Sequence, residues 1–165
     1  MIKPVDGDEY AKVFASIYNS ANTLFPENAR CDAGEEIFYR QLTEDHNFVY
    51  IKKDDVCGFV SYHRFAEYYE ITSLYVKRDC QRMKIGHHLL SFAESQIEKD
   101  CYIIIKVLKN ADWAVRFYQE HGYKPLSEAR DLAQAFNLTE KMWEKILYKI
   151  CDDKDDGRAA NFFKS

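Results

Sequence analysis

Residues 75–90, which read YVKRDCQRMKIGHHLL, join a strand to a helix through a polar loop that has Gly86 at the turn. Backbone N–H groups converge at such a turn, and the start of a helix adds a partial positive charge. Gln81, Arg82 and Lys84 surround the turn, and two of these side chains are cationic. The residue types and their spacing therefore predict a binding site for an anion.

Apolar patterning on either side of the loop predicts the elements that hold it. β-Branched residues over 68–76 predict a strand before the loop, and an apolar stripe over 85–99 predicts a helix after it. The nearly all-apolar segment 101–108 predicts a central strand that is covered on both faces. Asn110 is a candidate cap for a further helix, which Gly122 ends as the residue after the last turn.

The amino-terminal third of the chain is predicted to be mainly helical. Apolar residues at positions 10, 13, 14, 17, 18 and 21 lie on one face of an amphipathic helix, and a second helix is predicted over 33–42. Candidate N-terminal caps are Asp6 or Asp8 for the first helix and Asp32 with Glu35 for the second.

The remaining elements alternate between strands and helices. A hairpin is predicted over 48–62, with its turn at 52–55. Nearer the carboxyl terminus we expect a short strand from Tyr123 to Pro125, a helix over 129–136 and a last strand over 142–150. The order β-α-α-β-β-β-α-β-α-β-(α)-β, in which the helix over 129–136 is the one in brackets, predicts an α/β fold with a mixed, mostly antiparallel central sheet and helices on both faces.

Length and composition are those of one folded domain. The chain has 165 residues, of which 47% are hydrophobic, including 12 Tyr and 11 Phe, and this supports a substantial core. We expect a single domain over 1–151, followed by a charged tail over 152–165. The formal net charge of −4 argues against extensive nucleic-acid binding, because such binders present a basic excess.

The cysteines and the apolar runs indicate the compartment. Five scattered cysteines without a C-x-x-C pair favour reduced thiols over a disulfide framework or a zinc site, so no metal is expected. The amino terminus has no apolar signal-peptide core, and no apolar run approaches ~18 residues. We therefore expect a cytoplasmic protein without a membrane partner.

Two segments resemble the signature motifs of the GNAT superfamily of acetyl-CoA-dependent N-acetyltransferases. Residues 81–86, QRMKIG, match the pattern Q/R-x-x-G-x-G/A that follows the fourth strand, and residues 110–123, NADWAVRFYQEHGY, resemble the later N…A…FY…GF pattern. The similarity covers about 48–125, and the helical amino-terminal third agrees in element order. The resemblance implies a GNAT-like fold and acetyl-CoA as cosubstrate.

Lys84 departs from the motif, which has its first glycine at this position. A left-handed conformation would cost a lysine roughly 1 kcal/mol or more. We therefore expect ordinary right-handed helical backbone at Lys84, with a negative φ.

The resemblance also implies how the cosubstrate is bound. Backbone N–H groups at the start of the helix would bind the pyrophosphate, exposed backbone of the fourth strand would pair with the pantetheine arm, and the asparagine of the later motif would contact that arm. The residues expected to bind the cosubstrate are Leu74, Tyr75, Val76, Gln81, Arg82, Met83, Lys84, Ile85, Gly86, His87 and Asn110.

Two side chains match catalytic positions of the family. Tyr118 matches the residue that protonates the thiolate leaving group, and Glu70, eleven residues before Gln81, matches a general base that deprotonates the amine. A strand-four backbone N–H would polarise the thioester carbonyl. Glu67 and Glu27 are rival bases, while Tyr118 as a core aromatic and Glu70 as an ion-pair partner are the alternatives without catalysis.

Other reactive side chains have simpler interpretations. His87 and His88 diverge by about 100° on a helix and so cannot easily chelate one metal ion. Cys80 has no evident base partner for a nucleophilic role, and His63 and His121 are expected to be structural. The segment 129–139 is a candidate for either a substrate lid or edge protection.

These observations favour transfer of an acetyl group from acetyl-CoA to a primary amine of a small molecule or of a peptide or protein. The alternative is a catalytically silent domain that binds CoA or a protein partner. A dinucleotide-binding oxidoreductase is disfavoured, because the loop lacks G-x-G-x-x-G and follows a late strand. A homodimer is compatible with the resemblance, since many relatives dimerise.

Overall fold

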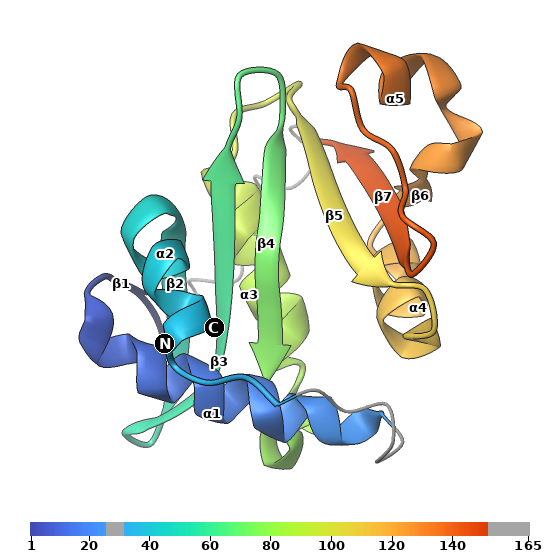
Figure 1. The fold of residues 1–165 in the computed structure, drawn as a ribbon. Helices are drawn as coiled ribbons and strands as arrows, with labels where there is room; N and C mark the ends of the chain where they lie inside the picture. The colour runs from blue at the N-terminus through green and yellow to red at the C-terminus, as the bar shows by residue number, and fades with distance from the viewer. Residues whose placement is uncertain (26–31, 152–165) are drawn as a thin grey trace.

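The computed structural model describes residues 1–25 and 32–151, and these form a central sheet with helices on both faces (Figure 1). The strands are β1 Ile2–Val5, β2 His46–Lys52, β3 Asp55–Arg64, β4 Tyr69–Val76, β5 Tyr102–Leu108, β6 Lys124–Pro125 and β7 Glu144–Ile150. Glu27, a rival base in the sequence predictions, Cys31, one of the five cysteines, and the tail 152–165 lie outside the described residues.

The strands follow the order β1-β2-β3-β4-β5-β7-β6, and every neighbouring pair is antiparallel except β4 with β5. This confirms the predicted α/β class with a mixed, mostly antiparallel sheet. Lys53 and Asp54 adopt φ values of 48° and 65° in the turn of the predicted hairpin. Such left-handed pairs match the right-handed twist of the flanking strands.

The helices lie in two layers, one on each face of the sheet (Figure 1). The α-helices are α1 Ala11–Ala21, α2 Glu36–Glu44, α3 Ile85–Gln96, α4 Asp112–Glu120 and α5 Arg130–Ala135. One core cluster packs α1 and α2 onto the sheet, and a larger cluster packs α3 and α4 onto the opposite face. Short 3₁₀ turns at Asp8–Tyr10, Asn22–Leu24, Arg78–Met83 and Leu126–Glu128 connect these elements.

The sheet core is dominated by aromatic and branched side chains, as the composition predicts. Phe14 of α1 stacks on Phe59 of β3 with ring centroids 3.9 Å apart, and both side chains are fully buried. A third cluster packs Leu132 and Phe136, at and just after α5, against Ile104 of β5. The segment predicted as a lid or an edge cover therefore lies against the sheet.

The predicted amino-terminal helix caps are wrong, whereas Gly122, with φ 91°, does follow the end of α4 as predicted. No side-chain hydrogen bond caps α1, α2 or α4 within the described residues. Asp8 lies inside a 3₁₀ turn instead of in front of α1. Ala111 instead of Asn110 precedes α4, because the Ala111 N–H donates to the Leu108 carbonyl at 3.0 Å in the turn after β5.

β4 and β5 pair over a short distance and then diverge, and this divergence leaves room for a site between them. The two strands pair only from Tyr69 opposite Ile103 to Ile71 opposite Ile105. At Thr72, β4 carries an extra residue relative to β3, because the register with β3 shifts between Ser61 and Tyr62. Beyond this bulge, β4 remains paired with β3 on one edge, and its other edge faces an opening.

Across residues 1–25 and 32–151, no helix has both the length and the apolar character needed to cross a membrane.

Candidate active site

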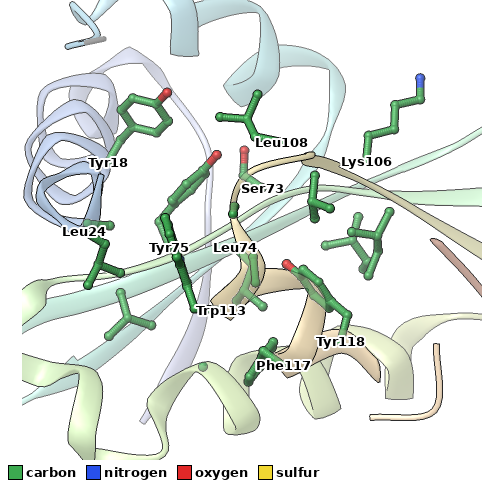
Figure 2. A pocket seen from close by; sticks show the side chains of 18 of the residues that line it. Tyr18, Leu24, Ser73, Leu74, Tyr75, Lys106, Leu108, Trp113, Phe117 and Tyr118 are labelled. Carbon is green, nitrogen blue, oxygen red and sulfur yellow. The ribbon is translucent and has the colours of Figure 1, made fainter. Parts of the chain in front are cut away.

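A cavity of about 740 Å³ lies where β4 and β5 diverge (Figure 2). Its walls come from both strands, from the end of α1 with the 3₁₀ turn that follows, from the start of α3, and from α4. The volume is within the usual range of small-molecule binding sites. Residues far apart in the sequence thus meet around one concave site.

The start of α3 forms one end of the cavity. The helix begins at Ile85, its first backbone bond runs from the His88 N–H to the Lys84 carbonyl at 3.1 Å, and no side-chain hydrogen bond caps it in the described part of the chain. Lys84, Gly86 and His87 line the cavity. Because the first N–H groups of a helix have no intrahelical acceptor, this end of the cavity suits an anion.

The predicted backbone conformation of Lys84 is wrong. Lys84 adopts φ 59° and ψ 21°, which is left-handed, and not the right-handed conformation expected. It stands between the 3₁₀ turn Arg78–Met83 and α3, so that one residue both ends the turn and precedes the helix. The conformation costs a non-glycine residue about 1–2 kcal/mol.

The structure brings most of the predicted cosubstrate-binding residues together. The cavity is lined by Leu74, Tyr75, Val76, Gln81, Lys84, Gly86 and His87. The Gln81 side-chain amide also donates a hydrogen bond to the Val76 carbonyl at 3.2 Å, which joins the loop to the end of β4. The binding roles of these residues stay predictions.

The other predicted cosubstrate residues do not line this cavity. Arg82 and Met83 are exposed, and Ile85 is buried in the core under α3. Asn110 lies at an adjoining cavity of about 480 Å³, which shares Phe25, Leu108 and Trp143 with the main one.

Side chains of β4 alternate between the two faces of the sheet beside the cavity. Leu74 and Val76 pack in the cluster under α3, whereas Tyr75 packs against Tyr18 of α1 with ring centroids 4.8 Å apart. The β4 edge that faces away from β3 is the one bordering the cavity. Its backbone groups are available to a ligand with peptide-like amides.

Tyr118 projects from α4 into the cavity wall (Figure 2). Its side chain is only 7% exposed, and burial, followed by the nearby Tyr75 hydroxyl, raises its pKa well above the ordinary value. The hydroxyl therefore stays protonated at neutral pH and can donate a hydrogen bond or a proton into the site.

Glu70 lies beside the cavity and is not among the residues that line it. Its Oε1 atom is buried, 3.3 Å from Nζ of Lys106, which does line the cavity. The pair has the distance of an ion pair but not the angles of a hydrogen bond, so Oε1 has no hydrogen-bond partner among the described residues. Burial raises the pKa of the Glu70 carboxyl, while Lys106 opposes the increase.

A polar network around Asp45, which no sequence pattern predicted, holds the β4 bulge. The Asp45 carboxylate accepts a hydrogen bond from Thr72 Oγ1 at 2.7 Å and contacts Nδ1 of His63 at 2.9 Å. One turn before Asp45, in α2, Gln41 Oε1 accepts a hydrogen bond from Ser73 Oγ at 2.8 Å. The structural role predicted for His63 agrees with this contact, but no local sequence pattern indicates Asp45, because its partners are distant in the chain.

A histidine pair bridges α3 and α4 at the mouth of the cavity. His87 Nδ1 lies 2.7 Å from His121 Nε2, and His121 Nδ1 lies 2.7 Å from the Phe117 carbonyl. Because a carbonyl only accepts, His121 donates from Nδ1, and a neutral His121 ring then accepts at Nε2 from His87 Nδ1. The two residues are 34 positions apart in the sequence, and the packing of α4 beside α3 brings them together.

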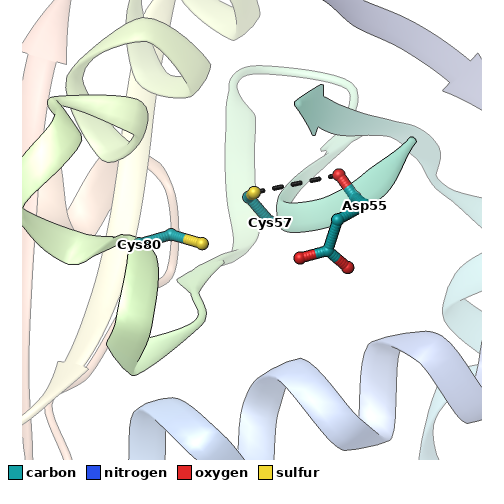
Figure 3. Close-up of side chains that lie close together, drawn as sticks. All are labelled: Asp55, Cys57 and Cys80. Carbon is teal, nitrogen blue, oxygen red and sulfur yellow. Dashed lines mark hydrogen bonds between the residues drawn. The ribbon is translucent and has the colours of Figure 1, made fainter. Parts of the chain in front are cut away.

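A second group of reactive side chains lies outside the cavity (Figure 3). Ligand atoms of Asp55, Cys57 and Cys80 all lie within 4.8 Å of one another, although the cysteines are 23 residues apart. Lys77 Nζ pairs with Asp55 Oδ1 at 2.9 Å, so a metal ion would compete with this ammonium. Burial and Cys57 raise the pKa of Cys80 to about 11, which disfavours a nucleophilic thiolate.

Comparison with protein families identifies one match that spans most of the chain. The model of the acetyltransferase (GNAT) family matches residues 14–123. The matched segment begins in α1 and ends just before β6, and therefore includes the cavity walls contributed by β4, α3, β5 and α4.

Solved structures of N-acetyltransferases share the fold at low sequence identity. The PaiA N-acetyltransferase of Thermoplasma acidophilum, solved in complex with coenzyme A, is 15% identical with a TM-score of 0.69, over 91% of this chain and 98% of that one. The ribosomal-protein-S18-alanine N-acetyltransferase of Escherichia coli is 15% identical with a TM-score of 0.66, over 92% and 94% of the two chains. The ribosomal-protein-alanine N-acetyltransferase of Brucella melitensis is 17% identical with a TM-score of 0.64, over 91% and 99%.

Proposed function

Because the chain belongs to the GNAT family of acetyltransferases, we propose that it transfers the acetyl group of acetyl-CoA to a primary amine of a small molecule or a peptide. Family membership confirms the predicted family and enzyme class. The cosubstrate and the amine acceptor are the parts that we propose. The observation that carries them is one cavity bordered by the open edge of β4, the buried Tyr118 and the start of α3, which no side-chain hydrogen bond from the described residues caps.

The residues at the α3 end fit the diphosphate of coenzyme A. The helix start supplies N–H donors and a partial positive charge, and Lys84 adds an ammonium group next to them. A Cβ atom at Gly86 would lie 3.6 Å from the Phe117 ring, an ordinary contact, and Gly86 has no positive φ. The fold itself therefore does not require glycine at position 86. This supports the interpretation that a bound ligand needs the space that a side chain would fill.

The open edge of β4 fits the arm of the cosubstrate. The pantetheine arm carries amides, and backbone N–H and C=O groups beyond Ile71 on this edge have no β5 partner. Pairing of the arm with Leu74 to Val76 would direct the thioester toward the bulge at Thr72. A β4 N–H at that point would polarise the thioester carbonyl.

Tyr118 would act on the leaving group. The neutral amine forms the new C–N bond, the C–S bond breaks, and the departing thiolate takes a proton from the Tyr118 hydroxyl. The amine nitrogen loses one proton as it becomes an amide nitrogen, and this proton reprotonates the Tyr118 phenolate, so charge and protons balance over one turnover. The raised pKa of Tyr118 keeps the donor protonated until a thiolate develops nearby.

Glu70 remains the first candidate for the general base. Its raised pKa makes the carboxylate a stronger base than an exposed glutamate, and efficient bases have pKa values near the working pH. Because Glu70 lies behind the cavity wall, the proton would reach it through Lys106 or a bridging water. Glu67 is exposed in the turn before β4 and remains the rival among the described residues.

The position of Glu70 also favours a second candidate function. A domain that binds CoA without catalysis would need no base in the cavity, and no glutamate of β4 lines it in the described chain. The two functions differ in whether turnover accompanies binding.

The test combines calorimetry with a thiol-release assay over a panel of primary amines. We expect CoA to bind, acetyl-CoA to release thiol with at least one amine, and Tyr118→Phe to lower kcat by about 10²-fold while CoA affinity is kept. Firm binding without turnover of any amine would support the silent domain. Failure to bind CoA would overturn both functions.

A further inference from the structure

The cavity has two chemically different ends, which lie on opposite faces of the sheet. Lys84, Gly86 and His87 form the end beside α3. On β5, Ile105 and Val107 pack under α3, so Lys106 and Leu108 point to the face that carries α1. The part of the cavity beside α1 is therefore separate from the proposed phosphate end.

Large apolar side chains surround the part of the cavity beside α1. Leu24, Leu108, Trp113 and Trp143 line the cavity although they are 41%, 46%, 39% and 61% exposed. Phe25 joins them, with its ring centroid 4.7 Å from that of Trp113. We call these five residues the apolar end. Exposed apolar groups that gather at the mouth of a cavity indicate a binding surface.

The charges around the apolar end are mostly positive. Lys109 lines the adjoining cavity, and Lys141 Nζ lies 5.6 Å from the Trp143 ring centroid. Lys106 is neutralised by Glu70. The carboxylate among the described lining residues at this end is Glu144, which accepts a hydrogen bond from the Lys141 N–H at 3.2 Å. Because like charges repel, this excess of positive charge disfavours a polycation as the ligand.

From these observations we propose that the acetyl acceptor is a monoamine that carries an aromatic or bulky apolar group. The amine nitrogen would reach the thioester near Tyr118 while its substituent lies on the apolar end, because Tyr118 and the apolar end line the same cavity. The amine class rests on the proposed acetyl transfer, whereas the binding of such an amine to the apolar end does not.

Competition among amines in the thiol-release assay tests this acceptor class. The full chain, saturated with acetyl-CoA, is assayed with 2-phenylethylamine, with ethylamine, which lacks the ring, and with spermidine, which carries several charges. We expect kcat/KM for 2-phenylethylamine to exceed that for each of the other two by at least about tenfold. A preference for spermidine would overturn the acceptor class and leave acetyl transfer intact.

Variants of the neighbouring residues Trp143 and Met142 test whether the apolar end causes this preference. Trp143→Ala should lower kcat/KM for 2-phenylethylamine by about tenfold and reduce its advantage over ethylamine. Met142→Ala is the matched control, since Met142 is 91% exposed and does not line the cavity. An equal loss for both amines in Trp143→Ala would contradict the proposal, because it would show a general effect on the site.

Equilibrium dialysis of radiolabelled 2-phenylethylamine in the presence of CoA gives a readout that needs no turnover. Saturable binding that weakens about tenfold in Trp143→Ala and not in Met142→Ala would support the apolar end even if no amine were acetylated. In that case only the proposed transfer would fail. Absence of saturable binding together with absence of a preference for the ring-bearing amine would overturn the inference itself.

Discussion

At the scale of single residues, Lys84 combines a backbone cost with a potential binding gain. Its φ of 59° is unfavourable for any residue that has a Cβ atom, yet Lys84 lines the cavity beside the start of α3. We expect Lys84→Gly to raise the free energy of unfolding by about 1 kcal/mol, because glycine adopts this conformation without a steric penalty. The same variant should bind CoA more weakly. Urea denaturation and calorimetry measure the two effects.

Lys84→Ala separates the two effects, since alanine keeps a Cβ atom but has no charge. It should weaken CoA binding like the glycine variant without the gain in stability. A Lys84→Gly protein that is no more stable than the parent would contradict the assigned strain.

The Glu70 carboxyl predicts a pH dependence of stability. Burial raises its folded-state pKa above the ordinary 4.5, so the folded chain holds this proton more tightly than the unfolded chain. The stabilising contribution of the protonated Glu70 carboxyl is complete below the unfolded-state pKa and is lost as the pH rises through the folded-state pKa. Glu70→Gln has no titrating group, so we expect its free energy of unfolding, relative to the parent, to increase as the pH rises above 4.5.

Urea denaturation of the parent and of Glu70→Gln at several pH values checks this sign. Lys106 is 39% exposed, so water can replace the lost ion pair. If the free energy of unfolding changes with pH in parallel for the two proteins, burial does not raise the pKa of the Glu70 carboxyl.

At the scale of elements, two glycines allow the requirements of the fold to be separated from those of the ligand. At Gly86, at the start of α3, a Cβ atom would meet nothing closer than 3.6 Å. We expect Gly86→Ala to change stability by no more than about 0.5 kcal/mol and to raise the Kd for CoA about tenfold. Denaturation and calorimetry on the same preparation test both parts. Unchanged CoA affinity would contradict the proposed position of the diphosphate.

Gly58 of β3 is the matched control. A Cβ atom there would lie 2.8 Å from the Tyr75 carbonyl oxygen and 3.1 Å from Leu89, so the backbone of β4 or the core would have to move. Gly58→Ala should therefore destabilise the fold by about 1–3 kcal/mol.

Local patterns predicted the elements better than they predicted their ends. Helical spacing and β-rich runs located α1, α3 and the hairpin to within a few residues, because each period reflects burial on one face. The caps predicted at Asp8 and Asn110 failed because 3₁₀ and turn hydrogen bonds already occupy the helix starts. The left-handed Lys84 was missed because the join of two helical segments, not the residue type, sets its φ.

At the scale of the whole molecule, the sequence motifs located the α3 end of the site but not its other walls. The turn at 81–86 and the segment at 110–123 are local patterns, and the cavity does contain residues from both. The Asp45 network, the His87–His121 pair and the apolar end each combine residues from separate elements. Such sets have no common spacing in the chain, so only tertiary packing reveals them.

The short pairing between β4 and β5 predicts that a bound ligand stabilises the whole fold. β4 and β5 pair over only three residues of each strand, from Tyr69 to Ile71 and from Ile103 to Ile105, and the cavity opens directly beyond them. A ligand that contacts both β4 and α4 would bridge this junction. At free CoA concentrations about 100-fold above Kd, we expect a gain of about 2.7 kcal/mol in the free energy of unfolding, because the unfolded chain has no such site.

Thermal unfolding with and without CoA measures this gain, and Gly86→Ala provides its control. At one fixed CoA concentration the variant should gain less, in proportion to the logarithm of its weaker affinity. Hydrogen exchange should show the added protection in β4 and at the start of α3, where the proposed contacts lie. An equal rise in Tm for the parent and Gly86→Ala would place CoA elsewhere on the molecule, and the proposed site would then be wrong even though the protein binds the ligand.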